Sequence, residues 1–283
     1  MTERDGSTEV LSIESIALES SSPEGGKISL WTIDRPQKLN ALNREVYAAL
    51  KQTCELAEAD AAVRVIVIRG APPAEPVEGE RAKPSAFVAG ADITEFVGQS
   101  SEDIRPHFEQ NAWEAIWNLS KPTIAMIDGF ALGGGTEIAL SCDIRIASDR
   151  SRFGTPEINL GLIPGGGGTQ RLTRLLGYGK AAEMVLSGEM ISASEAHRIG
   201  LINHIYSAEE LKSKTLKLAQ QIGSKSAHTL KAAKQVLRSA LDTSLTEGIS
   251  TEREVFCSLF DSADKEIGVQ AFLNRESPLW KGE

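Results

Sequence analysis

The sequence predicts an α/β fold with mainly parallel strands, followed by a helical C-terminal region. Three observations lead to this prediction. Short apolar runs alternate with helical patterns through the first half of the chain, one of these runs is apolar almost throughout, and the pattern beyond about residue 178 is helical. Strands that alternate with helices are typical of parallel sheets, and a continuous apolar run suits a strand buried on both faces.

The first elements are expected between residues 27 and 90. Residues 27–34 and 63–70 are predicted as strands, and residues 86–90 as a strand that ends in glycine. Asn43 is expected to cap a helix that continues to about Ala59. The apolar face of that helix would carry Val46, Leu50, Cys54 and Ala57.

The segment 71–85 interrupts this alternation. It contains four prolines and shows no apolar periodicity, so it is expected to form a loop. Lys83 in this loop could meet a phosphate, and the loop could shape the entrance of a binding site. A plain insertion is the favoured explanation of the segment.

Further alternation follows in the middle of the chain. A helix is expected over roughly 102–119, then a strand over 123–129 and a glycine turn over 133–135. A short helix should begin at Thr136, and residues 143–148 should form the next strand. The strands of this part are expected to pair in parallel.

The last hundred residues are predicted to be helical. Ser192 with Glu195, and Ser207 with Glu210, have the spacing of a capping box, and Gly223 is a suitable helix end. Further helices are expected at 226–241, 243–260 and 262–274. The resulting division is a polar tail at 1–10, an α/β core at 11–205 and a helical region at 206–283.

Composition argues against several classes of function. A net charge of −9 disfavours nucleic acid as the main partner, and no run approaches the roughly 20 apolar residues that a membrane span needs. The N-terminal residues resemble neither a signal peptide nor a transit peptide. The three cysteines form no CxxC pair and the four histidines lack metal-ligand spacing, so we expect a cytoplasmic protein without a metal site.

The segment 129–137 is the most informative for chemistry. Glycines at 133, 134 and 135 let backbone N–H groups approach a ligand closely, and the following helix adds a positive N-terminal dipole. Such a turn can bind an anion or stabilise a developing oxyanion. A tight strand-to-helix packing turn explains the same residues equally well.

Two glutamates are candidates for proton transfer. Glu137 follows the glycine turn, and Glu157 lies among Phe153, Pro156 and Ile158, where partial burial would raise its pKa. Each also has an ordinary interpretation, as a helix N-terminal acid and as an exposed loop acid. Together with an anion-stabilising turn, the two acids suggest proton transfer next to a carbonyl group.

Two other glycine segments are candidate binding turns. In 87–93, Gly90 ends a strand and the N–H of Ala91 is a candidate second oxyanion donor, although an ordinary turn capped by Asp92 is the alternative. The run 165–168 could cradle a phosphate. We favour the simpler interpretation that its glycines let a helix begin close to its neighbour.

Taken together, these segments resemble the enoyl-CoA hydratase/isomerase (crotonase) family, and most closely its enoyl-CoA hydratases. The resemblance extends over nearly the whole chain from about residue 27, with Asp128 and Thr136 as departures from the usual pattern. The matching segments are Arg35-Pro36 with Leu39 to Leu42, Phe87 to Ile93, Gly129 to Glu137, Phe153 to Glu157, Gly161 to Arg174, and Ala271 to Arg275.

The resemblance implies a fold, an assembly and a set of site residues. The fold would be a superhelix of ββα turns with a C-terminal helical oligomerisation region, and the assembly a homohexamer built as a dimer of trimers. Glu137 and Glu157 would be the catalytic acids, and the N–H groups of Ala91 and Gly134 the oxyanion hole. Substrate and CoA would contact Ala89, Ala91, Asp92, Ile93, Thr94, Gly134, Phe256 and Arg275, the last two from a neighbouring subunit.

The resemblance also implies a reaction. Two intact acids favour reversible hydration of a 2-trans-enoyl-CoA to a 3-hydroxyacyl-CoA, with short acyl chains as the default. CoA would be part of the substrate, and no separate cofactor is expected. Enoyl-CoA isomerisation is the main alternative, and an RNA-binding role, known among relatives, is disfavoured by the acidic composition.

Overall fold

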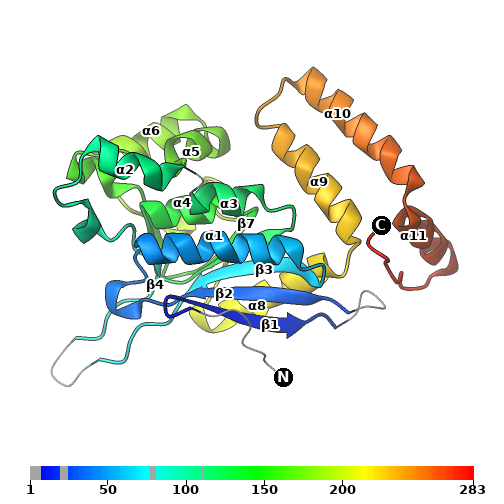
Figure 1. The fold of residues 1–283 in the computed structure, drawn as a ribbon, viewed down its shortest axis with the longest axis horizontal. Coiled ribbons are helices and arrows are strands. Elements are labelled where there is room, and N and C mark those ends of the chain that lie inside the picture. Colours follow the sequence, from blue (N-terminus) through cyan, green and yellow to red (C-terminus); the bar gives the residue numbers. More distant parts are fainter. Residues whose placement is uncertain (1–7, 20–24, 77–80, 110) are drawn as a thin grey trace.

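Two sheets form the framework of the computed structural model, which describes residues 8–19, 25–76, 81–109 and 111–283 (Figure 1). The larger sheet has the order β1-β2-β3-β5-β7-β10, and the smaller has the order β4-β6-β8-β9. Pairing is parallel except between β1 and β2 and between β8 and β9. The strands are β1 Leu11–Ala17, β2 Lys27–Ile33, β3 Val63–Gly70, β4 Ala86–Val88, β5 Thr123–Ile127, β6 Phe130–Leu132, β7 Ile144–Ser148, β8 Arg152–Gly154, β9 Ile191–Ser192 and β10 His204–Tyr206.

Successive turns of the chain build both sheets at once. Each turn adds one strand to the larger sheet and the next strand to the smaller one, as β3 and β4, β5 and β6, and β7 and β8 do. Helices follow each strand pair: α2 and α3 after β4, α4 after β6, and α5 after β8. This is a superhelix of ββα turns, so the predicted fold class is confirmed.

The first predicted helix is confirmed as α1, Arg44–Ala59. Asn43 caps it by accepting a hydrogen bond from the N–H of Val46 at 3.0 Å. The predicted apolar face is buried, and β3 beside it is buried over its first six residues. The face comprises Val46, Leu50, Cys54 and Ala57.

The single helix predicted over 102–119 is wrong. Two helices, α2 Ser101–Phe108 and α3 Ala112–Asn118, occupy this stretch, of which residue 110 lies outside the described part. Asn111 starts the second helix because its side chain accepts a hydrogen bond from the N–H of Glu114 at 2.9 Å. Pro106 lies inside the first helix, which ends two residues later.

The predictions at the C-terminal helices are confirmed in part. Ser192 and Ser207 each cap a helix, because the side chain accepts a hydrogen bond from the backbone N–H three residues later. The capping box predicted with Glu195 does not form, since the carboxylate of Glu195 pairs with Lys180 and Arg198 instead. Gly223 is the last residue of its helix, as predicted.

The remaining helices are α4 Gly134–Ser141, α5 Gly168–Leu176, α6 Tyr178–Ser187, α7 Ala193–Arg198, α8 Ala208–Gly223, α9 Ala227–Ser239, α10 Leu245–Ser258 and α11 Ala263–Asn274, with short 3-10 helices η1 Pro36–Lys38, η2 Ile93–Phe96, η3 Pro156–Leu160 and η4 Leu259–Asp261.

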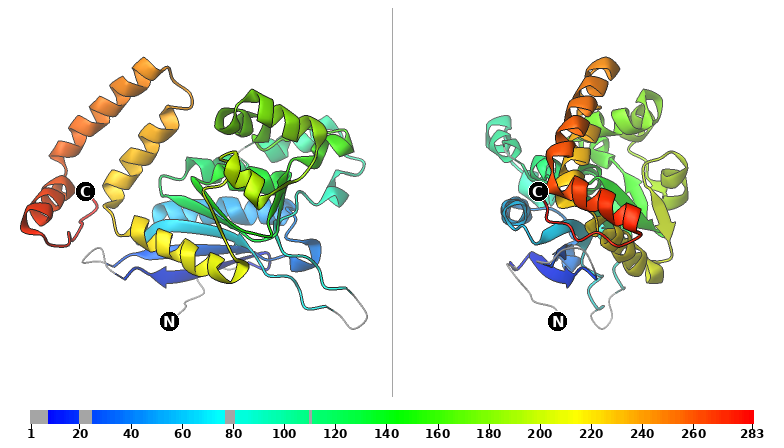
Figure 2. Two further views of the ribbon diagram at one scale, coloured as in Figure 1. Left: turned by 180° about the vertical axis from the view of Figure 1, so that it is seen from behind. Right: turned by 90° about the vertical axis from the view of Figure 1, so that its right-hand side faces the viewer.

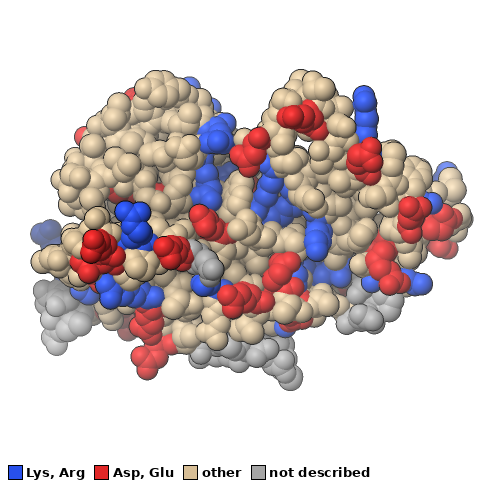
Figure 3. Space-filling view, turned by 45° about the horizontal axis from the view of Figure 1, so that its top comes forward, with Lys and Arg blue, Asp and Glu red and all other residues tan. Residues whose placement is uncertain are grey.

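Helices cover both faces of the larger sheet, while the last three stand apart. One face carries α1 and α3, and α8 packs across the other (Figure 2). The helices α9, α10 and α11, here called the C-terminal arm, extend away from the sheets (Figure 1). Lys and Arg side chains gather in the hollow between the arm and the α5–α6 side of the molecule (Figure 3).

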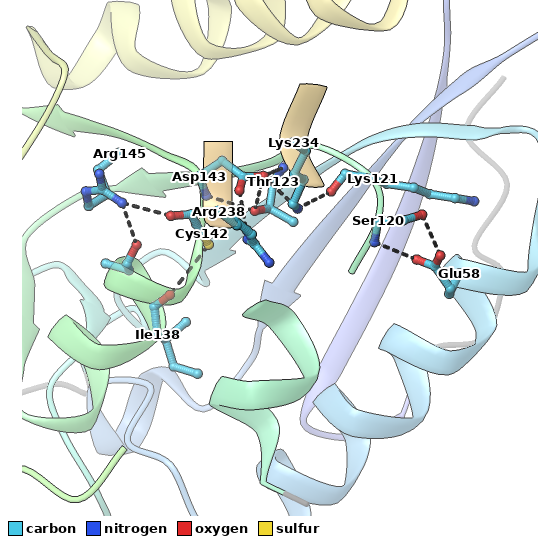
Figure 4. A network of polar contacts seen from close by, with 11 residues as sticks. Glu58, Ser120, Lys121, Thr123, Ile138, Cys142, Asp143, Arg145, Lys234 and Arg238 are labelled. Carbon is cyan, nitrogen blue, oxygen red and sulfur yellow. Dashed lines mark hydrogen bonds and ion pairs between the residues drawn. The ribbon is translucent and has the colours of Figure 1, made fainter. Parts of the chain in front are cut away.

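A buried polar network joins the arm to the core (Figure 4). The carboxylate of Asp143, at the start of β7, pairs with Lys234 at 2.7 Å and with Arg238 at 2.8 Å, both from α9. It also accepts a hydrogen bond from the N–H of Thr123 at 2.8 Å. Burial alone would raise the pKa of Asp143, but the two cations outweigh burial and hold that pKa below its usual value.

The predicted N-terminal tail lies mostly outside the described residues, since it covers residues 1–10 and the description begins at residue 8. Val10 is already buried against the core. Residues 77–80 of the predicted loop are likewise not described. Among the residues that are described, no helix combines the length and apolarity needed to cross a membrane.

Candidate active site

A cavity of about 420 Å³ lies at the N-terminal end of α4. Its wall includes the two predicted acids, Glu137 and Glu157, and the two predicted amide donors, Ala91 and Gly134. Most of the remaining lining is apolar, with a smaller polar part formed by Arg44, Glu95, Gln99 and His107. The apolar lining comes mainly from Ile93, Phe96, Ile104, Phe108, Trp113, Leu160, Leu162 and Ile163.

The turn between β6 and α4 presents the amide of Gly134. Gly133 adopts a positive φ of 51°, and its N–H donates to the carbonyl of Gly154 at 2.9 Å. Gly134 is the first helical residue, so its N–H has no acceptor within α4. The indole N–H of Trp113, on α3, donates to the carbonyl of Gly134 at 3.1 Å and so holds the turn in position.

The amide of Ala91 is free for a different reason. Leu42 pairs with this residue as an isolated parallel bridge, in which Leu42 N–H donates to Gly90 O at 2.8 Å and Asp92 N–H donates to Leu42 O at 2.7 Å. In a parallel bridge of this kind, the central residue turns its own N–H away from the partner. Within the described ranges no acceptor meets the Ala91 N–H.

Glu137 is held from the glycine run that follows η3. Its side chain is buried, and its Oε1 accepts hydrogen bonds from the N–H groups of Gly166 at 2.7 Å and Gly168 at 2.8 Å. The prediction that 165–168 lets a helix begin close to its neighbour is confirmed, because a Cβ on Gly168, the first residue of α5, would stand 3.0 Å from Glu137 Oε1 in α4. The run has a further role that was not predicted, since its amides bind a carboxylate of the chain itself. Burial, reinforced by the negative charge of Glu157, raises the pKa of Glu137 to about 7.

Glu157 lies in η3 and, like Glu137, lines the cavity. Its Oε2 is buried and has no hydrogen-bond partner among the described residues. Its Oε1 lies 2.9 Å from the point where a Cβ on Gly133 would stand, so the carboxyl group packs directly against the glycine turn. Burial raises the pKa of Glu157 above its ordinary value. A half-buried carboxyl with one unpartnered oxygen is suited to binding a proton or a ligand.

The structure separates the other predicted contact residues into two groups. Ala89 and Ile93 line the cavity with the residues above. Asp92 and Thr94 do not, because Asp92 accepts a hydrogen bond from Thr94 Oγ1 at 2.7 Å and pairs with Arg35 at 3.0 Å.

The remaining two predicted contacts lie elsewhere in this chain. Phe256 is on α10, where its ring packs edge-on against Phe260, and Arg275 caps the end of α11. Both belong to the C-terminal arm and do not line the cavity. Lys83, considered for a phosphate contact, donates to the carbonyl of Gln37 at 2.6 Å.

Several lining residues were not predicted. Tyr47 and Trp113 lie on α1 and α3, and Gly166 and Gly168 hold Glu137. The glycine run was visible in the sequence, but its partner lies about thirty positions earlier. Tyr47 follows the helix cap Asn43 by four residues and adjoins the predicted apolar face, and this position is the only sign in the sequence that it is partly buried.

A model of the enoyl-CoA hydratase/isomerase family matches residues 24–283. The chain belongs to this family. A protein of Rhizobium meliloti (strain 1021) named probable enoyl-CoA hydratase is 40% identical over 256 residues, which cover 90% of this chain and 95% of that protein. The short-chain-enoyl-CoA hydratase of Clostridium acetobutylicum is 37% identical, over 88% of this chain and 92% of that protein. A crystal structure of an enoyl-CoA hydratase from Bacillus anthracis has a TM-score of 0.86 and 30% identity, and the match covers 97% of this chain and 100% of that one.

One of the two departures of this enoyl-CoA hydratase/isomerase family member, Thr136, stabilises the glycine turn. The hydroxyl of Thr136 lies within hydrogen-bond distance of the carbonyls of Ala131, at 2.6 Å, and Gly154, at 2.8 Å. It thereby ties α4 to β6 and β8. The other departure, Asp128, pairs with Arg150 and does not line the cavity.

Proposed function

We propose that the chain is an enoyl-CoA hydratase that adds water reversibly to a 2-trans-enoyl-CoA and gives a 3-hydroxyacyl-CoA, with short acyl chains as the preferred substrates. One observation carries this proposal: two carboxyl groups with raised pKa share a cavity with two backbone N–H groups that meet no acceptor among the described residues. Hydration of an enoyl thioester needs these parts, because charge develops on the carbonyl oxygen while protons move at C2 and at the attacking water.

The amides of Ala91 and Gly134 would bind the thioester oxygen. When water attacks C3, the double-bond electrons shift toward C2 and the carbonyl, and the oxygen becomes enolate-like. Two preorganised donors stabilise that charge without reorganisation, and removal of one such donor typically raises the barrier by about 2.7–4 kcal/mol. The N-terminal dipole of α4 acts in the same direction.

The two acids would move the protons. Glu137 takes a proton from water as the O–C3 bond forms, and Glu157 delivers a proton to C2. The reaction thus needs one proton on the pair. The step ends with that proton on Glu137, and exchange with solvent returns a proton to Glu157 before the next turnover. The negative charge of Glu157 contributes to the raised pKa of Glu137, so the proton is best assigned to the pair, and burial of both carboxyls favours the singly protonated pair over the doubly ionised one.

The CoA part would extend along the segment from Ala89 to Thr94, with Phe256 and Arg275 of a neighbouring subunit closing on the nucleotide. The substrate itself supplies CoA, and no other cofactor enters the mechanism. Apolar residues of the C-terminal arm support a homohexamer, a dimer of trimers. Three free thiols support a reducing, cytoplasmic location.

Product analysis tests the reaction. Purified protein is incubated with crotonyl-CoA in H₂¹⁸O, and the products are analysed by mass spectrometry. The proposal predicts a 3-hydroxybutyryl-CoA that carries one ¹⁸O atom at C3. A product of unchanged mass with a moved double bond would identify an isomerase instead, and an unchanged substrate would contradict both reactions.

A further inference from the structure

Tyr47 is a polar residue of the cavity that the mechanism above does not use. It lies in the first turn of α1 and lines the cavity near the oxyanion turn. Its ring packs against Trp113, with ring centroids 5.0 Å apart and an interplanar angle of 56°. Because Trp113 itself donates to the carbonyl of Gly134, the Tyr47 ring is held in a fixed position relative to that turn.

The hydroxyl group of Tyr47 is directed at the N-terminal end of α4. Its oxygen lies 3.8 Å from the point where a Cβ on Gly134 would stand. In an α-helix the Cα–Cβ bonds tilt toward the N-terminus, which is also the direction of the free N–H groups. The hydroxyl therefore lies at the same end of the helix as the unpaired N–H of Gly134.

The hydroxyl is available as a donor. Within the described part of the chain no hydrogen bond occupies it, and the other atoms nearest the same point beside Gly134, Leu42 Cδ1 and Trp113 Cζ2, are carbons that cannot accept one. Burial raises the pKa of Tyr47, and the negative charges of Glu137 and Glu95 raise it further. The group is therefore protonated, and able to donate, at neutral pH.

We propose that the Tyr47 hydroxyl is a third hydrogen-bond donor at the reacting centre, directed at the thioester oxygen that the amides of Ala91 and Gly134 bind. This inference rests on the proposed hydratase function. The placement of the hydroxyl beside Gly134 favours the thioester oxygen over a polar group farther along the acyl chain. A donor aimed at an oxygen that gains negative charge stabilises the transition state more than the bound substrate.

The substitution Tyr47→Phe tests this role, because it removes one oxygen atom and keeps the ring contact with Trp113. The expected result is a fall in kcat of roughly tenfold to a hundredfold with KM changed less than about twofold. The urea midpoint of unfolding should not change. Tyr178→Phe, which removes an exposed hydroxyl on α6, is the matched control and should leave kcat unchanged.

A second readout reports on the thioester directly. Cinnamoyl-CoA is a conjugated thioester whose ultraviolet absorption moves to longer wavelength when its carbonyl is polarised. Bound to the wild-type chain it should show this shift, and bound to the Tyr47→Phe variant it should show a smaller one. Tyr178→Phe should give the wild-type shift.

Three results would overturn the inference. They are a Tyr47→Phe variant with wild-type kcat, a change confined to KM, and an unchanged cinnamoyl-CoA shift. Each would assign Tyr47 to the wall of the cavity only. A wild-type chain that hydrates no enoyl-CoA would instead contradict the proposed function, so the two failures are distinguishable.

Discussion

At the scale of single residues, Glu137 shows how a catalytic requirement opposes folding stability. Its carboxyl is 2% exposed and has a pKa raised from 4.5 to about 7 by burial. At a pH between 4.5 and about 7, the carboxyl of the folded chain therefore still holds a proton that the unfolded chain has already released. Since the unfolded state binds fewer protons there, stability falls as the pH rises from 4.5 to 7.

The substitution Glu137→Gln should stabilise the fold at alkaline pH. Glutamine keeps an oxygen that accepts from Gly166 and Gly168, but it carries no charge to bury. At pH 8 the free energy of unfolding should rise by up to about 3 kcal/mol, since one pKa unit corresponds to about 1.36 kcal/mol. Urea unfolding at pH 8 and pH 5 measures this, and the gain should be much smaller at pH 5. A gain independent of pH would contradict the assignment of a raised pKa.

Arg171 should position Glu137 through the glycine run. Its Nη1 donates to the carbonyl of Gly166 at 2.7 Å, and the N–H of Gly166 donates to Glu137. Arg171→Gln should lower kcat roughly tenfold to a hundredfold, because small displacements of a reacting group are costly. Arg174→Gln, on the exposed side of the same helix, is the control for steady-state kinetics. Equal kcat values in the two variants would exclude a positioning role.

Sequence reasoning reached these residues unevenly. Glu137, Glu157, Gly134 and Ala91 lie in local segments whose glycines and acids mark them. Their partners could not be predicted, because the contacts join distant parts of the chain: Gly166 lies 29 positions after Glu137. Burial, which raises both pKa values, is likewise a property of the folded chain and not of either segment.

At the scale of elements, the close packing of α4 on β4 sets the oxyanion geometry. A Cβ on Gly135 would stand 2.1 Å from the carbonyl oxygen of Val88, so only glycine permits this approach. The buried side chain of Asn40 holds the other end of β4, where it donates to the carbonyls of Ala86 at 2.7 Å and Ala71 at 2.9 Å. These contacts keep the two amide donors, Ala91 and Gly134, in the lining of one cavity.

Gly135→Ala should therefore destabilise the fold and distort the site. Overpacking against backbone typically costs about 1–3 kcal/mol, and the backbone carbonyl of Val88 cannot rotate away as a side chain can. Gly179→Ala, in α6, is the matched control, since its Cβ would meet nothing within 4 Å. That change should be neutral or should stabilise by roughly 0.4–1 kcal/mol. Similar thermal midpoints for the two variants would contradict the packing argument.

Most of the longer elements were predictable and most of the shortest were not, although β4, with three residues, was predicted and β1, with seven, was missed. α1 and β3 have lengths over which apolar periodicity is evident. The strands β6, β8 and β10 have three residues each, too few for a period to appear, and they form only because neighbouring strands supply their hydrogen bonds. The break between α2 and α3 depends on a cap at Asn111 that lies within a continuous helical pattern.

At the scale of the whole molecule, the C-terminal arm is anchored to the core through α9 and exposes apolar side chains on its outer helices. Arg238 lies over the ring of Trp117 at 4.1 Å and pairs with Asp143, so α9 is anchored to the core. The outer helices instead expose large apolar side chains, which mark interaction surfaces when they are clustered. These include Leu245, Phe256, Phe260, Phe272 and Leu273.

A charge on the arm should prevent assembly. Phe272 is 83% exposed, and Phe272→Glu should lower the molar mass of the particle in sedimentation velocity because a carboxylate would be buried in the proposed interface. Lys217→Glu, at an exposed position on α8, is the control and should sediment like the wild type. An unchanged sedimentation coefficient for Phe272→Glu would remove this residue from the interface.

The most direct measurement of the central claim is the rate of crotonyl-CoA hydration, followed as loss of enoyl absorbance, for Glu137→Gln and Glu157→Gln prepared separately. If both carboxyls act on one substrate, each variant should bind the thioester but lose roughly 10²–10⁴-fold in kcat, while circular dichroism stays like that of the wild type. Wild-type turnover by either folded variant would contradict the claim.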